Sequence, residues 1–208
     1  MITPTFSDLL KFTPAAELSP VHQARDTQTL LKEIKALRAQ ICELERAADT
    51  DPLLPLYNRR AFMREIDRAR HVMARYDILS SIIYFDLDRF KSVNDRYGHA
   101  VGDDILKAVG SVLSGGVRDC DLVARLGGDE FGVLLFKTDA SIAKAKASAL
   151  ACRISELAVT APAARITTGA SWGVAACEFE DTADQILSRA DRAMYIAKRR
   201  KLPESIKR

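Results

Sequence analysis

The chain carries Arg-Leu-Gly-Gly-Asp-Glu-Phe at residues 125–131, between two short apolar runs. Adjacent glycines supply the positive φ angles of tight turns, so Gly127 and Gly128 predict a β-hairpin whose strands are the two runs. Asp129 and Glu130 follow directly. Because side chains alternate along a strand, we expect one carboxylate to face a metal ion and the other a substrate. Taken alone, such a pair is also typical of a solvated hairpin tip.

Outside the hairpin, the pattern predicts two more strands and four helices. The run at 82–85 is Ile-Ile-Tyr-Phe, typical of a central strand covered on both faces, and residues 166–176 alternate like a second strand. We expect a turn at residues 94–99, followed by a helix with Asp103 and Asp104 in its first turn. The helices carry apolar stripes at 62–76, 105–113, 143–157 and 183–197. This order predicts an α/β domain with a layered architecture.

A heptad pattern precedes this domain. Its apolar residues are spaced alternately by four and three, which indicates the narrow seam of a coiled coil rather than a helix packed on its own domain. The seam consists of Leu30, Ile34, Leu37, Ile41, Leu44 and Ala48. Pro52 and Pro55 then interrupt regular helix. We therefore expect an N-terminal segment of unknown role at 1–25, a dimerisation helix at 26–50 and an α/β domain at 51–208.

Composition indicates an intracellular protein. Of the 208 residues, 48% are hydrophobic and 28% charged, and the net charge of +3 is too small to predict binding to nucleic acid or an anionic membrane. The four cysteines are widely spaced, which argues against a zinc knuckle or a disulfide framework. No apolar run approaches the about 18 residues of a membrane span, and no signal-peptide pattern opens the chain. We expect a cytoplasmic location.

Acids at strand ends point to a metal site. Asp86 ends the run at 82–85, and it can meet Asp129 if the two strands are neighbours. Two carboxylates with a backbone carbonyl nearby form a hard oxygen site suited to Mg²⁺, usually completed by substrate phosphates. Lys91 and the basic residues 198–201 supply charge that complements a triphosphate, although cations are also favoured at any helix C-terminus.

Several motifs, in order, resemble the GGDEF-domain diguanylate cyclases over about residues 50–200. The signature Gly-Gly-Asp-Glu-Phe is unaltered at 127–131. Upstream, Asp-Leu-Asp-Arg-Phe-Lys at 86–91 precedes Asn94-Asp95, Tyr97-Gly98-His99 and Gly102-Asp103, as in the family's other long signature. The opening at 51–62 is similar to the family's entry segment, although Leu54-Pro55 stands where Thr-Gly is usual. The resemblance implies a nucleotidyl-cyclase-like fold with a central, mainly antiparallel sheet flanked by helices.

The resemblance also implies an activity, in which two GTP molecules held in a homodimer condense into cyclic di-GMP and two pyrophosphates. By position, Asp86, the Leu87 carbonyl and Asp129 would hold Mg²⁺, or Mn²⁺ in its place. Glu130 would act beside them, as a further ligand or in deprotonating the attacking 3′-hydroxyl. Such phosphoryl transfer depends on positioning and charge neutralisation more than on covalent chemistry.

Further positions are implied for the rest of the nucleotide. Asn94 and Asp103 would read guanine, since a carboxylate accepts from the N1–H and the exocyclic amine that adenine lacks. The backbone around Arg89 and Phe90 would bind phosphates. Lys91 and Lys198 would join it there. The family's next phosphate-binding arginine falls at Leu202, so Arg200 or Lys201 would replace it.

A product site is implied as well. Arg118 and Asp121 form an RxxD motif that is separated from the GGDEF signature by five intervening residues, as in members inhibited by cyclic di-GMP. An alternative function follows from this motif, that of a catalytically weak receptor binding cyclic di-GMP at Arg118 and Asp121. The intact signature favours the enzyme. Residues 1–25 are a candidate docking segment for an unknown protein partner.

Overall fold

The computed structural model describes residues 20–161 and 164–201. The chain divides into two compact units, residues 1–48 and 49–208. The first unit contains a long helix, α1 (Pro20–Asp49), so the predicted helix is present and begins earlier than expected. Leu30, Ile34 and Leu37 on its predicted seam are 57%, 46% and 58% exposed, whereas the side chains of Ile41 and Leu44 lie outside what the structure describes.

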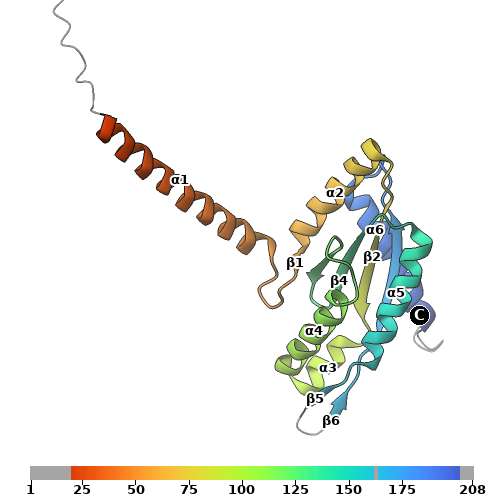
Figure 1. Ribbon diagram of the computed structural model, residues 1–208. Helices are drawn as coiled ribbons and strands as arrows, with labels where there is room; N and C mark the ends of the chain where they lie inside the picture. The colour runs from red at the N-terminus through yellow and green to blue at the C-terminus, as the bar shows by residue number, and fades with distance from the viewer. Residues whose placement is uncertain (1–19, 162–163, 202–208) are drawn as a thin grey trace, which may run out of the picture. The chain divides into compact units, whose positions relative to one another are not determined.

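The described part of the second unit is built on a five-stranded sheet in the order β1-β3-β4-β2-β7 (Figure 1). The strands are β1 (Tyr57–Asn58), β2 (Ser80–Leu87), β3 (Leu122–Gly127), β4 (Glu130–Phe136) and β7 (Ala170–Ala176). β1 runs parallel to β3, and the other neighbouring pairs are antiparallel. The mainly antiparallel sheet predicted from the sequence is thus confirmed.

Helices cover both faces of this sheet. The helices are α2 (Arg59–Tyr76), α3 (Phe90–Tyr97), α4 (His99–Ser114), α5 (Ala140–Glu156) and α6 (Ala183–Lys201). One apolar core lies between the sheet and helices α4 and α5, and a second lies between the sheet and helices α2 and α6 (Figure 1). Because β2 lies between β4 and β7, its residues 80–85 are buried on both faces, as the uninterrupted apolar run predicts.

The predicted hairpin joins β3 and β4. Gly128 has a φ of 30°, a left-handed value that glycine adopts without the clash that a Cβ causes, and a register shift follows Arg125. The Arg125 guanidinium holds the turn, because Nε and Nη2 donate to the Gly128 carbonyl at 3.0 and 2.8 Å. Its Nη1 forms an ion pair with Asp51 at 3.2 Å. Asp129 lies in the turn rather than on a strand, so the expected strand alternation does not apply to it.

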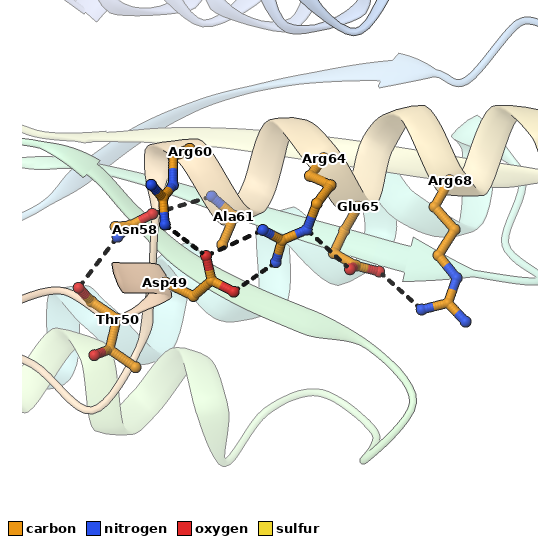
Figure 2. Close-up of polar contacts among 8 residues, drawn as sticks. All are labelled: Asp49, Thr50, Asn58, Arg60, Ala61, Arg64, Glu65 and Arg68. Atoms are coloured by element: carbon orange, nitrogen blue, oxygen red, sulfur yellow. Dashed lines mark hydrogen bonds and ion pairs between the residues drawn. The ribbon is translucent and has the colours of Figure 1, made fainter. Parts of the chain in front are cut away.

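Polar contacts fasten the start of the domain to α2, as Figure 2 shows. Asp49 bridges two arginines of α2, accepting from Arg60 Nη2 at 3.2 Å and from Arg64 Nη1 and Nη2 at 3.1 and 2.7 Å. Asn58 caps the helix, because its Oδ1 accepts from the Ala61 amide while its Nδ2 donates to the Thr50 carbonyl. These contacts hold the segment that leads into α2. Pro52 and Pro55 prevent that segment from forming a regular helix of its own.

Three local predictions were wrong. Residues 94–97 belong to helix α3 rather than to a turn, and only Gly98 separates α3 from α4. Because α4 begins at His99, Asp103 and Asp104 lie in its second turn rather than its first. The strand predicted over 166–176 is split, since Ile166 ends a separate hairpin of β5 (Val159–Ala161) and β6 (Ala164–Ile166) before β7 begins. Within residues 20–161 and 164–201, no helix combines the length and apolarity needed to cross a bilayer.

Candidate active site

The strand order brings the predicted acidic residues to one edge of the sheet. β2 and β4 are antiparallel neighbours, and Asp86 near the end of β2 is paired with Glu130 at the start of β4. The Leu87 amide donates to the Asp129 carbonyl at 3.2 Å, which holds the turn against the end of β2. Asp86, Asp129 and Glu130 therefore lie together although Asp86 and Asp129 are far apart in the sequence.

A lysine from the last helix neutralises this cluster. Lys198 Nζ of α6 donates to Asp86 Oδ1 in a short ion pair, and the Asp86 side chain is only 15% exposed. Burial raises the pKa of Asp86, as do the neighbouring charges of Asp129 and Glu130, while Lys198 acts in the opposite direction. Lys198, predicted as a phosphate ligand, thus serves in this structure as the counter-ion of an acidic strand end.

Tyr84 is a residue of this site that the sequence did not indicate. It lies two positions before Asp86 on β2, on the same face of the strand, and its side chain is almost fully buried. Burial and a hydrogen bond to Glu130 both raise the pKa of Tyr84, so its hydroxyl stays protonated and donates to the Glu130 carboxylate. In the sequence, Tyr84 is one of four apolar residues in a run, and no local signal separates it from the core.

Asp88, the second acid of the Asp-Leu-Asp motif, fastens β7 and α6 to the end of β2. Its Oδ1 accepts from Ser171 Oγ at 2.7 Å, and its Oδ2 forms an ion pair with Lys201 at 3.1 Å. Lys201 also donates to the Ala170 carbonyl at 2.8 Å. Lys201 is therefore bonded to Asp88 and to the Ala170 carbonyl. Of the other two residues considered for the phosphate-binding role, Arg200 is exposed and Leu202 lies outside the described residues.

The donors at this edge fit a divalent cation. Three carboxylates share a partly buried site, and Lys198 pairs with one of them, Asp86. Within the described residues, no group of three or more His, Cys, Asp or Glu side chains is placed so that it could hold a metal ion without further ligands. An incomplete set of oxygen ligands is what Mg²⁺ uses when substrate phosphates complete its coordination.

The two predicted guanine-reading residues lie on adjacent helices. Asn94 is on α3 and Asp103 is on α4, and both are partly buried. Asn94 Oδ1 is fully buried and has no hydrogen-bond partner among the described residues. Buried polar atoms are rarely left unpaired, and those that are often mark functional sites.

The predicted phosphate-binding backbone lies at the start of α3. Arg89 has a φ of 61°, a left-handed conformation that costs free energy for a residue with a Cβ. No side chain caps the helix at this residue, which leaves the first amides of α3 available to an anion. Phe90 is buried and anchors the helix, while Lys91 is exposed beside it.

Arg118 and Asp121 lie in the turn before β3, at the opposite end of that strand from Gly127. Asp121 is engaged by the backbone, since its Oδ2 accepts from the Arg118 amide at 3.0 Å and its Oδ1 from the Phe136 amide at 3.1 Å. A cavity of ≈ 540 Å³ lies beside this turn, lined by Asp121 together with Tyr57 and Arg68. The exposed Arg118 side chain leaves a cation at the surface next to Asp121.

Comparison with known proteins agrees with this geometry. A family model described as "Diguanylate cyclase, GGDEF domain" matches residues 48–202. Diguanylate cyclase TpbB of Pseudomonas aeruginosa strain UCBPP-PA14 is 35% identical over 206 residues, covering 92% of this chain and 46% of TpbB. Diguanylate cyclase A of Treponema denticola is 39% identical over 119 residues, covering 57% of this chain and 32% of that protein. The chain thus spans less than half the length of these curated relatives.

Solved structures show the same fold. The coiled coil and GGDEF domain of DgcB from Caulobacter crescentus, in complex with c-di-GMP, superposes with a TM-score of 0.77 at 27% identity, covering 86% of this chain and 95% of that one. Diguanylate cyclase SiaD of Pseudomonas aeruginosa, in complex with its activator SiaC, gives 0.74 at 29% identity, covering 86% and 70%. Diguanylate cyclases with this domain generally depend on a divalent metal ion. Fold, strand-end acids and motif order agree with the family match, and the chain belongs to the GGDEF-domain diguanylate cyclase family.

Proposed function

We propose that the protein is a diguanylate cyclase that converts two GTP molecules into cyclic di-GMP and two pyrophosphates. The observation that supports this most strongly is the pairing of Asp86 with Glu130 beside an unaltered Gly-Gly-Asp-Glu-Phe turn. In each of two steps, the 3′-hydroxyl of one GTP attacks the α-phosphate of the other. A phosphorus–oxygen bond forms, the bond to the β-phosphate breaks, and pyrophosphate leaves.

The acidic strand end supplies the charge for this reaction. Asp86, the Leu87 carbonyl, Asp129 and Glu130 would hold Mg²⁺, or Mn²⁺ in its place, which when bound neutralises phosphate charge and favours the ionised 3′-hydroxyl. Tyr84 donates to Glu130 and so limits the directions in which that carboxylate can point. Lys198, which pairs with Asp86 in this structure, would bind the phosphates of the nucleotide.

Recognition of the nucleotide is assigned to the α3–α4 pair. Asn94 and Asp103 would bind the guanine edge, with the Asp103 carboxylate accepting from N1–H and the exocyclic amine. The uncapped start of α3 would bind phosphate oxygens through the amides near Arg89 and Phe90, with Lys91 beside them. This division assigns the phosphates to the start of α3 and the base to Asn94, one turn further along the helix.

Condensation of two nucleotides requires two active sites, which we propose α1 brings together in a homodimer. The alternating four-and-three spacing and the exposure of Leu30, Ile34 and Leu37 support a seam completed by a second copy. Joining two domains through a coil raises their effective concentration, so turnover no longer depends on chance encounters. The relative DgcB, whose structure includes a coiled coil, supports the same reading.

We also propose that the product regulates the enzyme at Arg118 and Asp121. Arg118 can pair with guanine or phosphate, and the cavity beside Asp121 offers room for part of a dinucleotide. Cyclic di-GMP is two-fold symmetric, so one molecule can contact two neighbouring domains and hold them apart. Residues 1–25 remain a candidate segment for a protein activator, of the kind that SiaC is for SiaD.

Incubation of the full chain with GTP and Mg²⁺, followed by chromatography of the nucleotides, tests the proposed activity. We expect cyclic di-GMP at half the molar amount of the GTP consumed, together with one pyrophosphate for each GTP. ATP in place of GTP serves as the control and should give no cyclic product. A protein that binds cyclic di-GMP but leaves GTP unchanged would instead be the receptor described by the alternative function.

A further inference from the structure

Asn94 occupies space that a side chain at residue 102 would fill. A Cβ built on Gly102 would lie 1.9 Å from Asn94 Oδ1 and 3.1 Å from Asn94 Cγ. The ring of Phe90 would also be close, with Cζ at 3.2 Å. A separation of 1.9 Å is far inside van der Waals contact, so any residue other than glycine at 102 must displace the Asn94 carboxamide.

Helix formation alone does not explain a glycine at this position. Gly102 is buried within α4, and glycine is the poorest helix former apart from proline. The amide of Gly102 donates to the Gly98 carbonyl at 3.3 Å, an ordinary helical bond that any residue except proline can form. The feature that favours a glycine at residue 102 is therefore the close approach of the Asn94 side chain to its Cα.

The Oδ1 atom of this carboxamide is buried and, within the described residues, accepts no hydrogen bond. Its position therefore depends on the space that the missing side chain of Gly102 leaves open. Asp103 directly follows Gly102, and the same packing therefore sets the spacing between Asn94 and Asp103. A change at residue 102 acts on both groups assigned to the base.

We propose that Gly102 is a positioning residue for guanine selectivity. By leaving room for Asn94 between α3 and α4, it holds the Asn94 carboxamide and the Asp103 carboxylate where both meet one guanine edge. This inference rests on the proposed roles of Asn94 and Asp103 in binding GTP. Gly102 itself touches no substrate atom.

Nucleotide binding to the full chain tests this role. The probes are the α,β-methylene analogues of GTP and ATP with Mg²⁺, because a methylene bridge cannot be broken in the reaction. We expect Gly102→Ala to weaken binding of the guanosine analogue about tenfold, equivalent to about 1.4 kcal/mol, and to leave the adenosine analogue unchanged. Selectivity for guanine, rather than affinity for triphosphate, is thus the quantity that falls.

Gly110→Ala is the matched control. Gly110 is also buried in α4, two turns further on, and its added Cβ would lie 3.2 Å from Leu56 Cδ1 and 3.6 Å from Leu54 Cδ1. The control has the same gain in helix propensity, and its methyl group meets leucine side chains rather than Asn94. It should retain the parental preference for the guanosine analogue.

A double variant separates positioning from general loss of packing. In an Asn94→Ala background the carboxamide is absent, so the methyl group of Gly102→Ala has room. We expect Gly102→Ala to lower the melting temperature of the parent but not that of Asn94→Ala. The double variant should also bind the guanosine analogue as Asn94→Ala does, with no further loss. This comparison of melting temperatures holds even if Gly102→Ala alone folds poorly.

The outcomes distinguish this inference from the function on which it rests. If the parent prefers the guanosine analogue and Gly102→Ala keeps that preference, the positioning role is wrong and the proposed cyclase stands. Equal destabilisation by Gly102→Ala with and without Asn94 would also overturn it, because the methyl group would then be clashing elsewhere. If the parent itself shows no guanine preference, the proposed base recognition fails, and the inference fails with it.

Discussion

Two acids at the end of β2 have different partners. Asp86 faces Lys198 and the acids of the turn, whereas Asp88, two residues later, binds Ser171 and Lys201. The two acids of one motif thus have different partners, because β2 ends between them. We infer that Asp88 maintains the geometry of the edge on which Asp86 acts.

Asp129→Asn should reduce cyclic di-GMP synthesis by about 100-fold or more, since a metal ion contributes several kcal/mol to such reactions. The substitution removes a charge with little change of volume, so the melting temperature should stay near the parental value. Initial rates with GTP and Mg²⁺ and a thermal melt measure both effects. Asp67→Asn, a carboxylate of α2 that pairs with Arg70, is the control. Near-parental turnover by Asp129→Asn would refute the metal assignment.

Asp49 should make stability depend on pH. A hydrogen bond from Arg64 and further contacts with Arg60 hold the pKa of Asp49 below its ordinary value of 3.8. The folded state therefore binds fewer protons, and the stabilisation is fully present above pH 3.8 and is lost as the pH falls through the folded pKa. Asp49→Asn should lower the melting temperature at pH 7 and approach the parent in acid. A gap between the two proteins that stays constant with pH would contradict this origin.

At the scale of elements, the predicted seam of α1 differs in burial from the apolar stripes of the helices that follow it. Leu30, Ile34 and Leu37 are all exposed in one chain, whereas the apolar stripes of α2, α4, α5 and α6 are buried against the sheet. A helix with an exposed apolar seam gains stability by pairing that seam with another helix. Assembly through α1 therefore need not disturb the fold of residues 49–201.

Ile34→Lys should convert the dimer to a monomer and slow turnover most at low protein concentration, because a charge in the seam opposes pairing. Ala39→Lys introduces the same charge on the outer side of the heptad pattern and should leave both properties unchanged. Sedimentation and specific activity across a dilution series measure the effect. If both variants keep the parental mass and activity, another surface must join the domains.

At the scale of the whole molecule, the active site and the predicted product site lie at opposite ends of β3. The six residues of this strand span about 20 Å, so a ligand beside Arg118 does not reach the turn at Gly127 and Gly128. A ligand there can inhibit only by favouring one arrangement of domains or of the hairpin over another. We therefore predict that any inhibition by a ligand at this site is non-competitive with GTP.

Arg118→Ala should relieve inhibition by added cyclic di-GMP while GTP turnover is retained. Arg118 is a cleaner probe than Asp121, because Asp121→Ala would also remove acceptors from two backbone amides. Arg75→Ala, at an exposed arginine near the end of α2, controls for the loss of a cation. Initial rates against cyclic di-GMP concentration decide the matter. Superimposable curves for Arg118→Ala and the parent would leave Arg118 without a regulatory role.

The sequence by itself determined the local elements. Gly-Gly between apolar runs predicted the hairpin, the run at 82–85 predicted a buried strand, and apolar stripes predicted α2, α4, α5 and α6, because turn chemistry and side-chain period act over a few residues. It failed at residues 94–99, where polar residues and one glycine conceal the short helix α3. Its motif order also named the acids at residues 86, 129 and 130, whose roles remain predictions.

Only the tertiary structure decided which distant groups meet. Lys198 neutralises Asp86 across 112 residues, Tyr84 donates to Glu130, and Ser171 binds Asp88. These contacts depend on β2 lying between β4 and β7 in a particular register. Strand order and register are set by the packing of the entire core on both faces of the sheet, and no short window of sequence contains that information.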